Sequence, residues 1–340
     1  PELPVFKGEL LMDVHGTGCY TSQAAMKWYN RRNEQLSAAA ERAAVMARLT
    51  GQQTYPMDAL NENYKRFIFH QFHDDLTGTS IPRAYEFSWN DELLSLTGFS
   101  HILTSAAGAF SRQLDTQVKG TPLVLYNASG FAANQPVEVA LPQGYRSAMV
   151  FDEKGQTVPA QIVNRDGQQK ILLHASVPAL GYAVYDIRNG AAKQVIGVRA
   201  TGNTLENSIY RITLNQNGDL CSILDKPTGK ELVESGKAVR LAMFTHNPSY
   251  AWPAWEIMKT TLEQTPVDIK DNVKISVVEQ GPLRGAICVE RTFGESKIKQ
   301  TIQLTEGGQS DRIDSMGTSA LYEQIKEGAD SQEGLNRKRT

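Results

Sequence analysis

The 340-residue sequence contains few cysteines, and the three that it has, Cys19, Cys221 and Cys288, lie far apart. An odd and widely spaced set argues against a disulfide framework and against a metal cage built from thiolates. The chain also lacks a net charge of either sign, because 35 basic residues nearly balance 37 acidic ones. We therefore expect no nucleic acid and no anionic membrane surface among its partners.

Long apolar runs are absent as well. No run approaches the roughly 20 residues that cross a bilayer, so we expect no membrane association. The chain opens on Pro-Glu-Leu-Pro, which is neither a signal peptide nor an initiating methionine, and this is consistent with a piece of a longer protein. The compartment stays open between the cytoplasm and, for a bacterial protein, the periplasm. The apolar content of 41% is sufficient for the cores of about two or three domains.

Helical periodicity dominates the first third of the chain. Helices are predicted over residues 22–49, 55–72 and, with interruptions, 82–114. Thr21 or Ser22 can cap the first helix, and Gly51 ends it. Three antiparallel helices with short links predict a three-helix bundle over residues 21–118.

After Gly120 the pattern changes to short apolar and alternating runs separated by turn signals, which are typical of β-structure. Strands are predicted over residues 122–127, 137–141, 148–152, 160–163, 170–174, 182–187, 209–215, 220–224, 273–280, 285–293 and 298–304. They predict a small β-sandwich over residues 119–190 and a larger, incomplete one over 191–314, followed by a polar C-terminal tail over 315–340. The fold class is therefore multidomain α+β.

The segment from His70 to Ser80 concentrates the chemistry. Two imidazoles, His70 and His73, and two carboxylates, Asp74 and Asp75, precede a turn in which Gly78 allows close backbone approach. On a helical wheel His73 projects away from the apolar stripe of the helix over 55–72. Imidazole and carboxylate are both good zinc ligands, so the segment is either a metal site or a helix end whose side chains bond nearby backbone.

A second cluster runs from Trp252 to Glu256 and contains Trp255. Aromatic rings stack on sugar faces and a carboxylate binds sugar hydroxyls, whereas two tryptophans can equally well fill the core of a sandwich. The residues alone leave both interpretations open.

These motifs together resemble glycoside hydrolase family 38, the retaining α-mannosidases. The resemblance is carried by Gln71-Phe72-His73-Asp74 with Gly78-Thr79-Ser80-Ile81, by His15-Gly-Thr with Tyr20-Thr21-Ser22-Gln23, by Leu125-Tyr126-Asn127, by Leu205-Glu206-Asn207 and by Ala254-Trp255-Glu256-Ile257. They extend in order along nearly the whole chain, which makes the set far more specific than any one member.

The resemblance implies a zinc-type metal with His73 as one ligand and Asp74 as a contact to a sugar hydroxyl. Trp255 and Glu256 are further candidate substrate contacts, and His15 is either a sugar contact or an ordinary loop histidine. His70 matches no ligand and is expected on the bundle surface or at an interface, and no chemistry is assigned to Asp75.

The same resemblance implies that the nucleophile and the acid/base residue belong to a barrel that precedes Pro1, so residues 1–20 are the tail of that barrel and no catalytic residue is assigned here. The expected function is the C-terminal portion of an α-mannosidase acting on a mannose-containing oligosaccharide, nearly inactive on its own. The alternative is a non-catalytic carbohydrate-binding or structural module. A bare scaffold would expose apolar surface near Phe69 and associate into a homo-oligomer.

Overall fold

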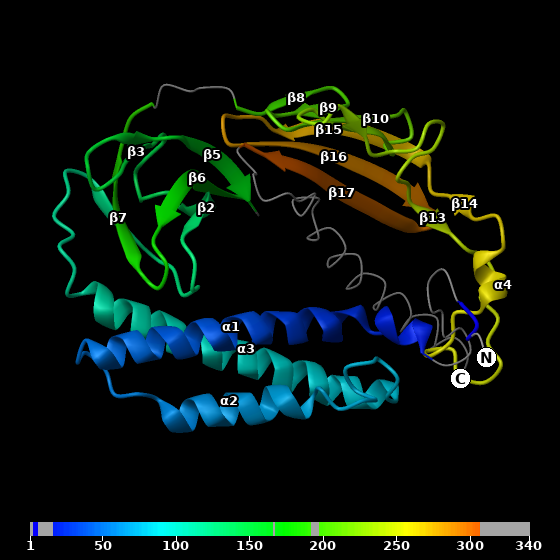
Figure 1. The fold of residues 1–340 in the computed structure, drawn as a ribbon, viewed down its shortest axis with the longest axis horizontal. Helices are drawn as coiled ribbons and strands as arrows, with labels where there is room; N and C mark the ends of the chain where they lie inside the picture. The colour runs from blue at the N-terminus through cyan, green and yellow to red at the C-terminus, as the bar shows by residue number, and fades with distance from the viewer. Residues whose placement is uncertain (1–2, 6–15, 166, 192–196, 307–340) are drawn as a thin grey trace. The chain divides into compact units, whose positions relative to one another are not determined.

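The computed structural model describes residues 3–5, 16–165, 167–191 and 197–306 (Figure 1). The chain divides into two compact units, one made of Pro1–Phe110 with Ala242–Val267 and the other of Ser111–Leu241 with Asp268–Thr340. The first unit holds the helices and the second holds nearly all the strands. The α+β class is therefore confirmed.

The first unit is built on α1 (Ala24–Leu49), α2 (Met57–Phe69) and α3 (Pro82–Ser111), and each of these helices runs opposite to the one before it (Figure 1). One hydrophobic core joins all three, formed by Ala40, Ala44, Leu60, Phe67, Phe99 and Ile102. Gly98 lets α3 approach α2 closely, because a Cβ there would overlap the side chain of Asn63.

The helix ends differ from the sequence prediction. Neither Thr21 nor Ser22 caps α1, which begins after Gln23, a residue with a left-handed φ of 50°. The second helix ends at Phe69, so His73 lies in the turns that follow α2 instead of on the helix. The third helix is continuous where interruptions were predicted. Helix ends depend on hydrogen bonds to distant segments, which periodicity does not contain.

By length and composition alone, α3 could cross a membrane, with a mean hydropathy of 1.3 over its most apolar window. A buried helix of a helical core passes the same test. Phe99 and Ile102 of this helix lie in the core shared with α1 and α2, and the fully buried Glu92 lies on it too.

The second unit begins with two small sheets. One has the order β1-β7-β3-β4 and the other β2-β6-β5. Their strands are β1 (Thr121–Tyr126), β2 (Ala133–Ala140), β3 (Met149–Phe151), β4 (Thr157–Val158), β5 (Ala160–Arg165), β6 (Gln168–Val177) and β7 (Tyr182–Arg188). Val150, Ile171, Leu173, Tyr185 and Ile187 contribute to one core between the two sheets.

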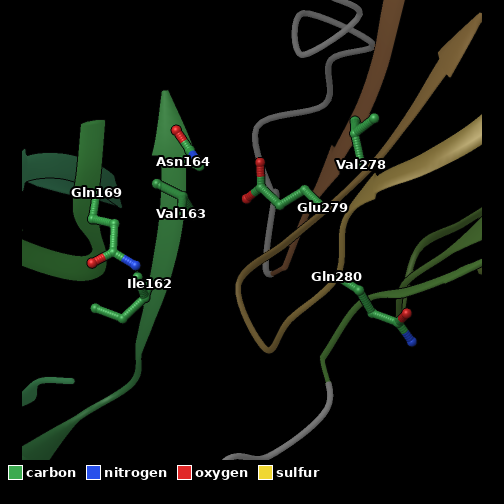
Figure 2. Close-up of a pocket in the computed structure, with 7 residues that line it drawn as sticks. All are labelled: Ile162, Val163, Asn164, Gln169, Val278, Glu279 and Gln280. Carbon is green, nitrogen blue, oxygen red and sulfur yellow. The ribbon is translucent and has the colours of Figure 1, made fainter. Parts of the chain in front are cut away.

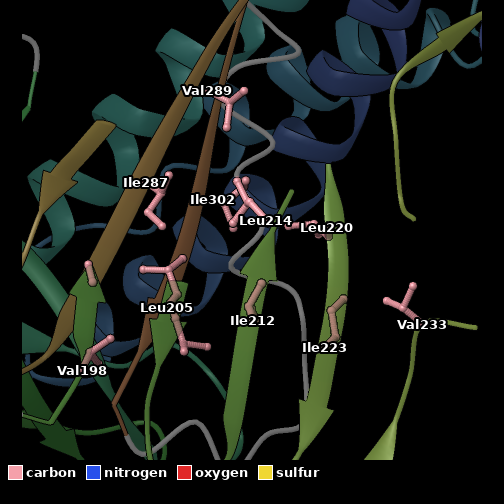
Figure 3. Close-up of a cluster of buried hydrophobic side chains, with 12 residues drawn as sticks. Val198, Leu205, Ile212, Leu214, Leu220, Ile223, Val233, Ile287, Val289 and Ile302 are labelled. Carbon is pink, nitrogen blue, oxygen red and sulfur yellow. The ribbon is translucent and has the colours of Figure 1, made fainter. Parts of the chain in front are cut away.

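Two further sheets follow, ordered β12-β11-β10-β9-β8 and β15-β16-β17. Their strands are β8 (Arg199–Thr201), β9 (Thr204–Glu206), β10 (Tyr210–Leu214), β11 (Leu220–Asp225), β12 (Lys230–Glu231), β15 (Asp271–Glu279), β16 (Arg284–Phe293) and β17 (Ser296–Thr305). Figure 3 shows their shared core, in which Leu205 and Leu214 of the first sheet face Ile287 and Val289 of the second.

Between β12 and β15 the chain leaves the second unit and joins the first. This excursion carries β13 (Ala242–Met243), α4 (Lys259–Leu262) and β14 (Val267–Asp268), and β13 pairs with β14. Every strand predicted from the sequence overlaps an observed one, whereas these elements and other strands of two or three residues were missed because they are too short to show a period.

Several predictions lie outside the described residues. They include His15, most of the barrel tail over residues 1–20, the polar tail over 315–340 and the incomplete end of the larger sandwich beyond residue 306. The other domain boundaries stay a prediction.

Within the second unit, a buried amide joins the first pair of sheets, β1 to β7, to the second pair. Gln161 on β5 is 4% exposed, and its Oε1 accepts from the backbone N–H groups of Leu283 and Arg284, both at 3.1 Å. Its Nε2 donates to Glu279 Oε1 at 2.9 Å and to the Arg284 carbonyl at 3.1 Å. The Arg284 guanidinium in turn bonds Glu138 of β2 and Glu279 of β15.

We expect Gln161→Ala to destabilise the second unit by about 2 to 4 kcal/mol, because it leaves several buried backbone groups without partners. Urea unfolding followed by far-ultraviolet circular dichroism measures this. The matched control is Gln169→Ala, at an exposed position on β6, which should change stability by less than about 0.5 kcal/mol. Equal effects of the two variants would contradict the assigned role of Gln161.

Candidate functional site

The segment after α2 is held in a series of tight turns. The Asp74 carbonyl accepts from the backbone N–H groups of Thr79 at 3.1 Å and Ser80 at 2.9 Å, and from the Tyr85 hydroxyl at 3.2 Å. The Thr77 hydroxyl donates to the His73 carbonyl. The backbone under His73 and Asp74 is thus fixed at several points, which orients both side chains.

His70 and Asp75 attach this segment to α3. The His70 Nδ1 lies 2.5 Å from Asp75 Oδ2, and the Ser88 hydroxyl of α3 donates to both Asp75 oxygens at 2.8 and 2.9 Å. His70 is only 4% exposed, so it does not lie on the bundle surface, the first of the two positions expected for it. The helix ends before His70, and the turn directs its ring inward against α3.

His73 and Asp74 face outward instead. Their side chains are 72% and 40% exposed, and His73 Nε2 lies 3.3 Å from Asp74 Oδ2. The other oxygen of Asp74, Oδ1, accepts from the Thr79 hydroxyl at 3.2 Å. The His73 ring packs against the ring of Phe72, with 4.2 Å between centroids. The segment therefore divides its four polar side chains into a buried pair and an exposed pair.

A second chain segment, residues 16–22, packs against the loop that contains Trp255. The Trp255 carbonyl accepts from the N–H groups of Gly16 at 3.1 Å and Gly18 at 2.9 Å. The Ser22 hydroxyl donates to the Ala254 carbonyl at 2.6 Å. A Cβ at Gly18 would come within 2.8 Å of the Ala254 carbonyl oxygen, so only glycine fits there.

The same segment also contacts the turn that follows Asp74. A Cβ at Gly78 would overlap the carbonyl of Ser22, and Gly78 has a φ of +82° that favours glycine independently. The close approach predicted for this glycine is therefore observed. Three segments far apart in the sequence, around Ser22, Asp74 and Trp255, meet in the first unit.

Lys27 on α1 lies at this junction, a role that the sequence analysis missed. Its ammonium donates to the Ser22 carbonyl. Burial lowers the pKa of Lys27 to about 8, an effect partly opposed by the nearby Cys19 thiol. Burial also raises the pKa of Cys19, and Lys27 opposes that shift, while Asp74 adds to it. The role of this half-buried lysine, whose ammonium bonds a backbone carbonyl, is visible only in the folded contacts.

Trp255 and Glu256 differ in what they present. Trp255 is half-buried and supplies its carbonyl to residues 16–22. The Glu256 side chain is buried, at 1% exposure of the residue, and its Oε2 accepts from the Ser249 hydroxyl and from the Tyr250 N–H at 2.8 Å. These bonds, led by that from Ser249, lower the pKa of Glu256. The Glu256 carboxylate is therefore hydrogen-bonded within its own loop. A contact between this carboxylate and a sugar stays a prediction.

The donors for a metal are of the right kind but too few. Zinc takes nitrogen and oxygen ligands at about 2.0 Å, and two ligands of a tetrahedral site then lie about 3.3 Å apart. His73 Nε2 is accessible, and Asp74 Oδ2 lies 3.3 Å from it as an ion-pair partner. Among the described residues no group of three His, Cys, Asp or Glu side chains could hold a metal ion. The described residues thus offer His73 as one accessible nitrogen donor and do not by themselves complete a metal site.

The second unit has a groove of about 310 Å³ between the edge strands β5 and β15, lined by Ile162, Val163, Asn164, Gln169, Val278, Glu279 and Gln280 (Figure 2). Its Glu279 carboxylate is already bonded to Arg284 and Gln161. Because the charged group of the groove is engaged within the protein, the groove is a weaker candidate than the junction in the first unit.

Comparisons with known proteins follow the same segments. Residues 15–109 match the α-mannosidase middle domain, and residues 205–315 match the C-terminal domain of glycosyl hydrolases family 38. The mouse (Mus musculus) protein α-mannosidase 2C1 is 26% identical over 316 residues, which cover 90% of this chain and 28% of the relative. α-Mannosidase G of Dictyostelium discoideum is 24% identical over 326 residues, covering 85% of this chain and 28% of the relative.

Among solved structures, a protein in glycosyl hydrolase family 38 from Enterococcus faecalis aligns with a TM-score of 0.64 at 18% identity, covering 85% of this chain and 42% of that one. This likeness shows the shared fold. The matches first define the class of this chain's domains, which are glycosyl hydrolase domains. More narrowly, the chain belongs to glycoside hydrolase family 38 and carries its middle and C-terminal domains. It spans 28% of the length of the curated relatives named here.

We expect Gly78→Ala to destabilise the first unit by about 2 to 4 kcal/mol, because the methyl group is strained at positive φ and also meets the Ser22 carbonyl. Gly51→Ala is the matched control, since Gly51 has a φ of +71° and nothing lies within 4 Å of its would-be Cβ, so it should cost only about 1 kcal/mol. Urea unfolding followed by tryptophan fluorescence measures both, because Trp28, Trp89, Trp252 and Trp255 all belong to the first unit. Equal losses would mean that the contact with Ser22 contributes nothing.

Proposed function

We propose that this chain is the C-terminal portion of a retaining α-mannosidase that hydrolyses α-linked mannose from glycans. In this proposal the three helices form the family's bundle, and the paired sheets form its two β-sandwiches. The observation that carries the proposal is the junction in the first unit, where the segments around Ser22, Asp74 and Trp255 meet. At this junction Ser22 bonds Ala254, a residue 232 positions away. The three segments are those that carry the family resemblance.

His73 is proposed as a ligand of a zinc-type metal, and Asp74 as a hydrogen-bond acceptor for a sugar hydroxyl. A bound divalent cation would hold sugar hydroxyls and favour distortion of the ring. Asp74 is suited to its role because Thr79 orients Oδ1 and leaves Oδ2 beside the His73 imidazole. The nucleophile and the acid/base residue are proposed to come from a domain outside this chain.

Exposed apolar side chains on the same segment support a covering domain. Phe69 is 73% exposed, Phe72 58% and Ile81 71%, and they flank His73 and Asp74. Large apolar groups beside an active site are usually covered by a substrate or by another domain. The exposure is also what a module that binds glycans without cleaving them would show, and Trp252, 58% exposed, favours this alternative.

The test is His73→Ala in the complete parent protein. We expect loss of bound zinc, measured by elemental analysis, and a fall in kcat/KM toward an α-mannoside of about 100-fold or more, because a metal ligand has been removed. His101→Ala, at an exposed position on α3, is the matched control and should retain both metal and activity.

Two outcomes would count against the proposed enzyme. Retention of metal and of full activity in His73→Ala would overturn the assigned ligand. A parent protein that binds mannose oligosaccharides with His73 intact but hydrolyses none of them would favour the binding module.

A further inference from the structure

A carboxyl group is buried inside the helical core, away from the junction described above. Glu92 on α3 and Asn33 on α1 are both 0% exposed. The Asn33 amide nitrogen donates to Glu92 Oε2 and, at 3.1 Å, to the Glu92 carbonyl. Within the residues that the structure describes, Glu92 Oε1 and Asn33 Oδ1 have no hydrogen-bond partner. Two buried acceptors are therefore left where a donor is missing.

The charges around Glu92 do not supply a counter-ion in contact with it. From the segment after α2 it is faced by His70 and Asp75, from its own helix by Asp91, and from α1 by the neutral Asn33. The His70 ring is already engaged by Asp75 at 2.5 Å and by Asp91 at 3.3 Å, and Arg66 pairs with Asp91 at 2.8 Å. An ionised Glu92 would thus be a fully buried charge close to two other carboxylates.

We propose that Glu92 is held as a neutral carboxylic acid in the folded protein and that loss of its proton weakens the packing of α1 against α3. A protonated carboxyl supplies the missing O–H donor, which can satisfy the orphaned acceptor of Asn33. This inference does not depend on the glycosidase function. It makes the helical unit a pH-sensitive element of the fold.

The direction of the pH dependence follows from linkage. Burial raises the pKa of Glu92 to about 7, while the hydrogen bond from Asn33 and the proximity of His70 oppose the rise in part. Because the folded-state pKa lies above the unfolded one, near 4.5, the folded state binds more protons between these values. The stabilisation is complete below about pH 4.5 and is lost as the pH rises through about 7.

The residue that holds Asp75 in place lies on the same helix as Glu92. Ser88, which donates to Asp75, lies four residues before Glu92 and so one turn away on the same side of α3. A weaker hold of α3 on α1 is therefore expected to reach the turn that carries the buried pair His70 and Asp75.

The experiment uses the full chain and compares wild type with Glu92→Gln between pH 5 and 8.5. Tryptophan fluorescence during urea unfolding reports the first unit. The unfolding equilibrium constant of the wild type should rise about 100-fold more over this range than that of Glu92→Gln, whose amide keeps a donor at every pH. Glu86→Gln, at an exposed position of α3, is the control and should follow the wild type. Parallel pH profiles for wild type and Glu92→Gln would overturn the proposal.

A direct measurement keeps the proposal testable even if Glu92→Gln does not fold. Carbon-13 nuclear magnetic resonance of wild type labelled at the glutamate carboxyl carbon should show one resonance that titrates near pH 7. Its presence supports the neutral acid. If every glutamate carboxyl titrates below about pH 5, Glu92 is ionised in the folded protein and the proposal fails.

Discussion

The first unit depends on one steric constraint, the close approach of residues 16–22 to two other segments. Glycine at position 18 admits the backbone of residues 254–256, and glycine at position 78 admits the carbonyl of Ser22. Hydrogen bonds from Gly16, Gly18 and Ser22 to the same loop fix the contact once it forms. Because the loop around Trp255 is inserted from far along the chain, this contact ties an excursion of the β region to the helices. The orientation of Asp74 depends on it through the turn that contains Gly78.

In the segment from His70 to Asp75, burial separates two polar side chains that hold the backbone from two that stay accessible. His70 and Asp75 satisfy each other and Ser88 inside the protein, so their hydrogen-bonding capacity is used to hold the backbone. His73 and Asp74 are held by their backbone carbonyls, through Thr77 for His73 and Tyr85 for Asp74, and their side chains stay accessible. Bonds to the backbone position a side chain while leaving part of its own bonding capacity accessible, as at Asp74, where only Oδ1 accepts from Thr79. That separation is the physical argument for treating the exposed pair as the functional one.

Much of this arrangement can be predicted from the sequence, and the reasons for the rest are physical. Strand positions followed from alternation, since residues such as Ile212 and Ile287 must face a core, and the helical core followed from the spacing of Leu60 and Phe67. The burial of His70 did not follow, because it depends on the contact with Asp75, which Ser88 of α3 bonds in turn. The roles of Gly18 and Lys27 depend on residues more than 200 positions away or on a backbone carbonyl, and periodicity carries neither signal.

Buried polar groups in the two units are handled in opposite ways. Gln161 in the second unit has hydrogen-bond partners on both polar atoms of its amide, so it joins the two pairs of sheets through a fully matched contact that includes the Glu279 carboxylate. Glu92 and Asn33 in the first unit leave two acceptors without partners among the described residues, and a proton on Glu92 would supply a donor. A fully satisfied amide favours one rigid arrangement, whereas a carboxyl whose satisfaction depends on a proton allows the arrangement to loosen. The polar contact around Gln161 therefore holds the second unit in one arrangement. The stability of the helical unit that carries His73 and Asp74 depends instead on pH, through Glu92.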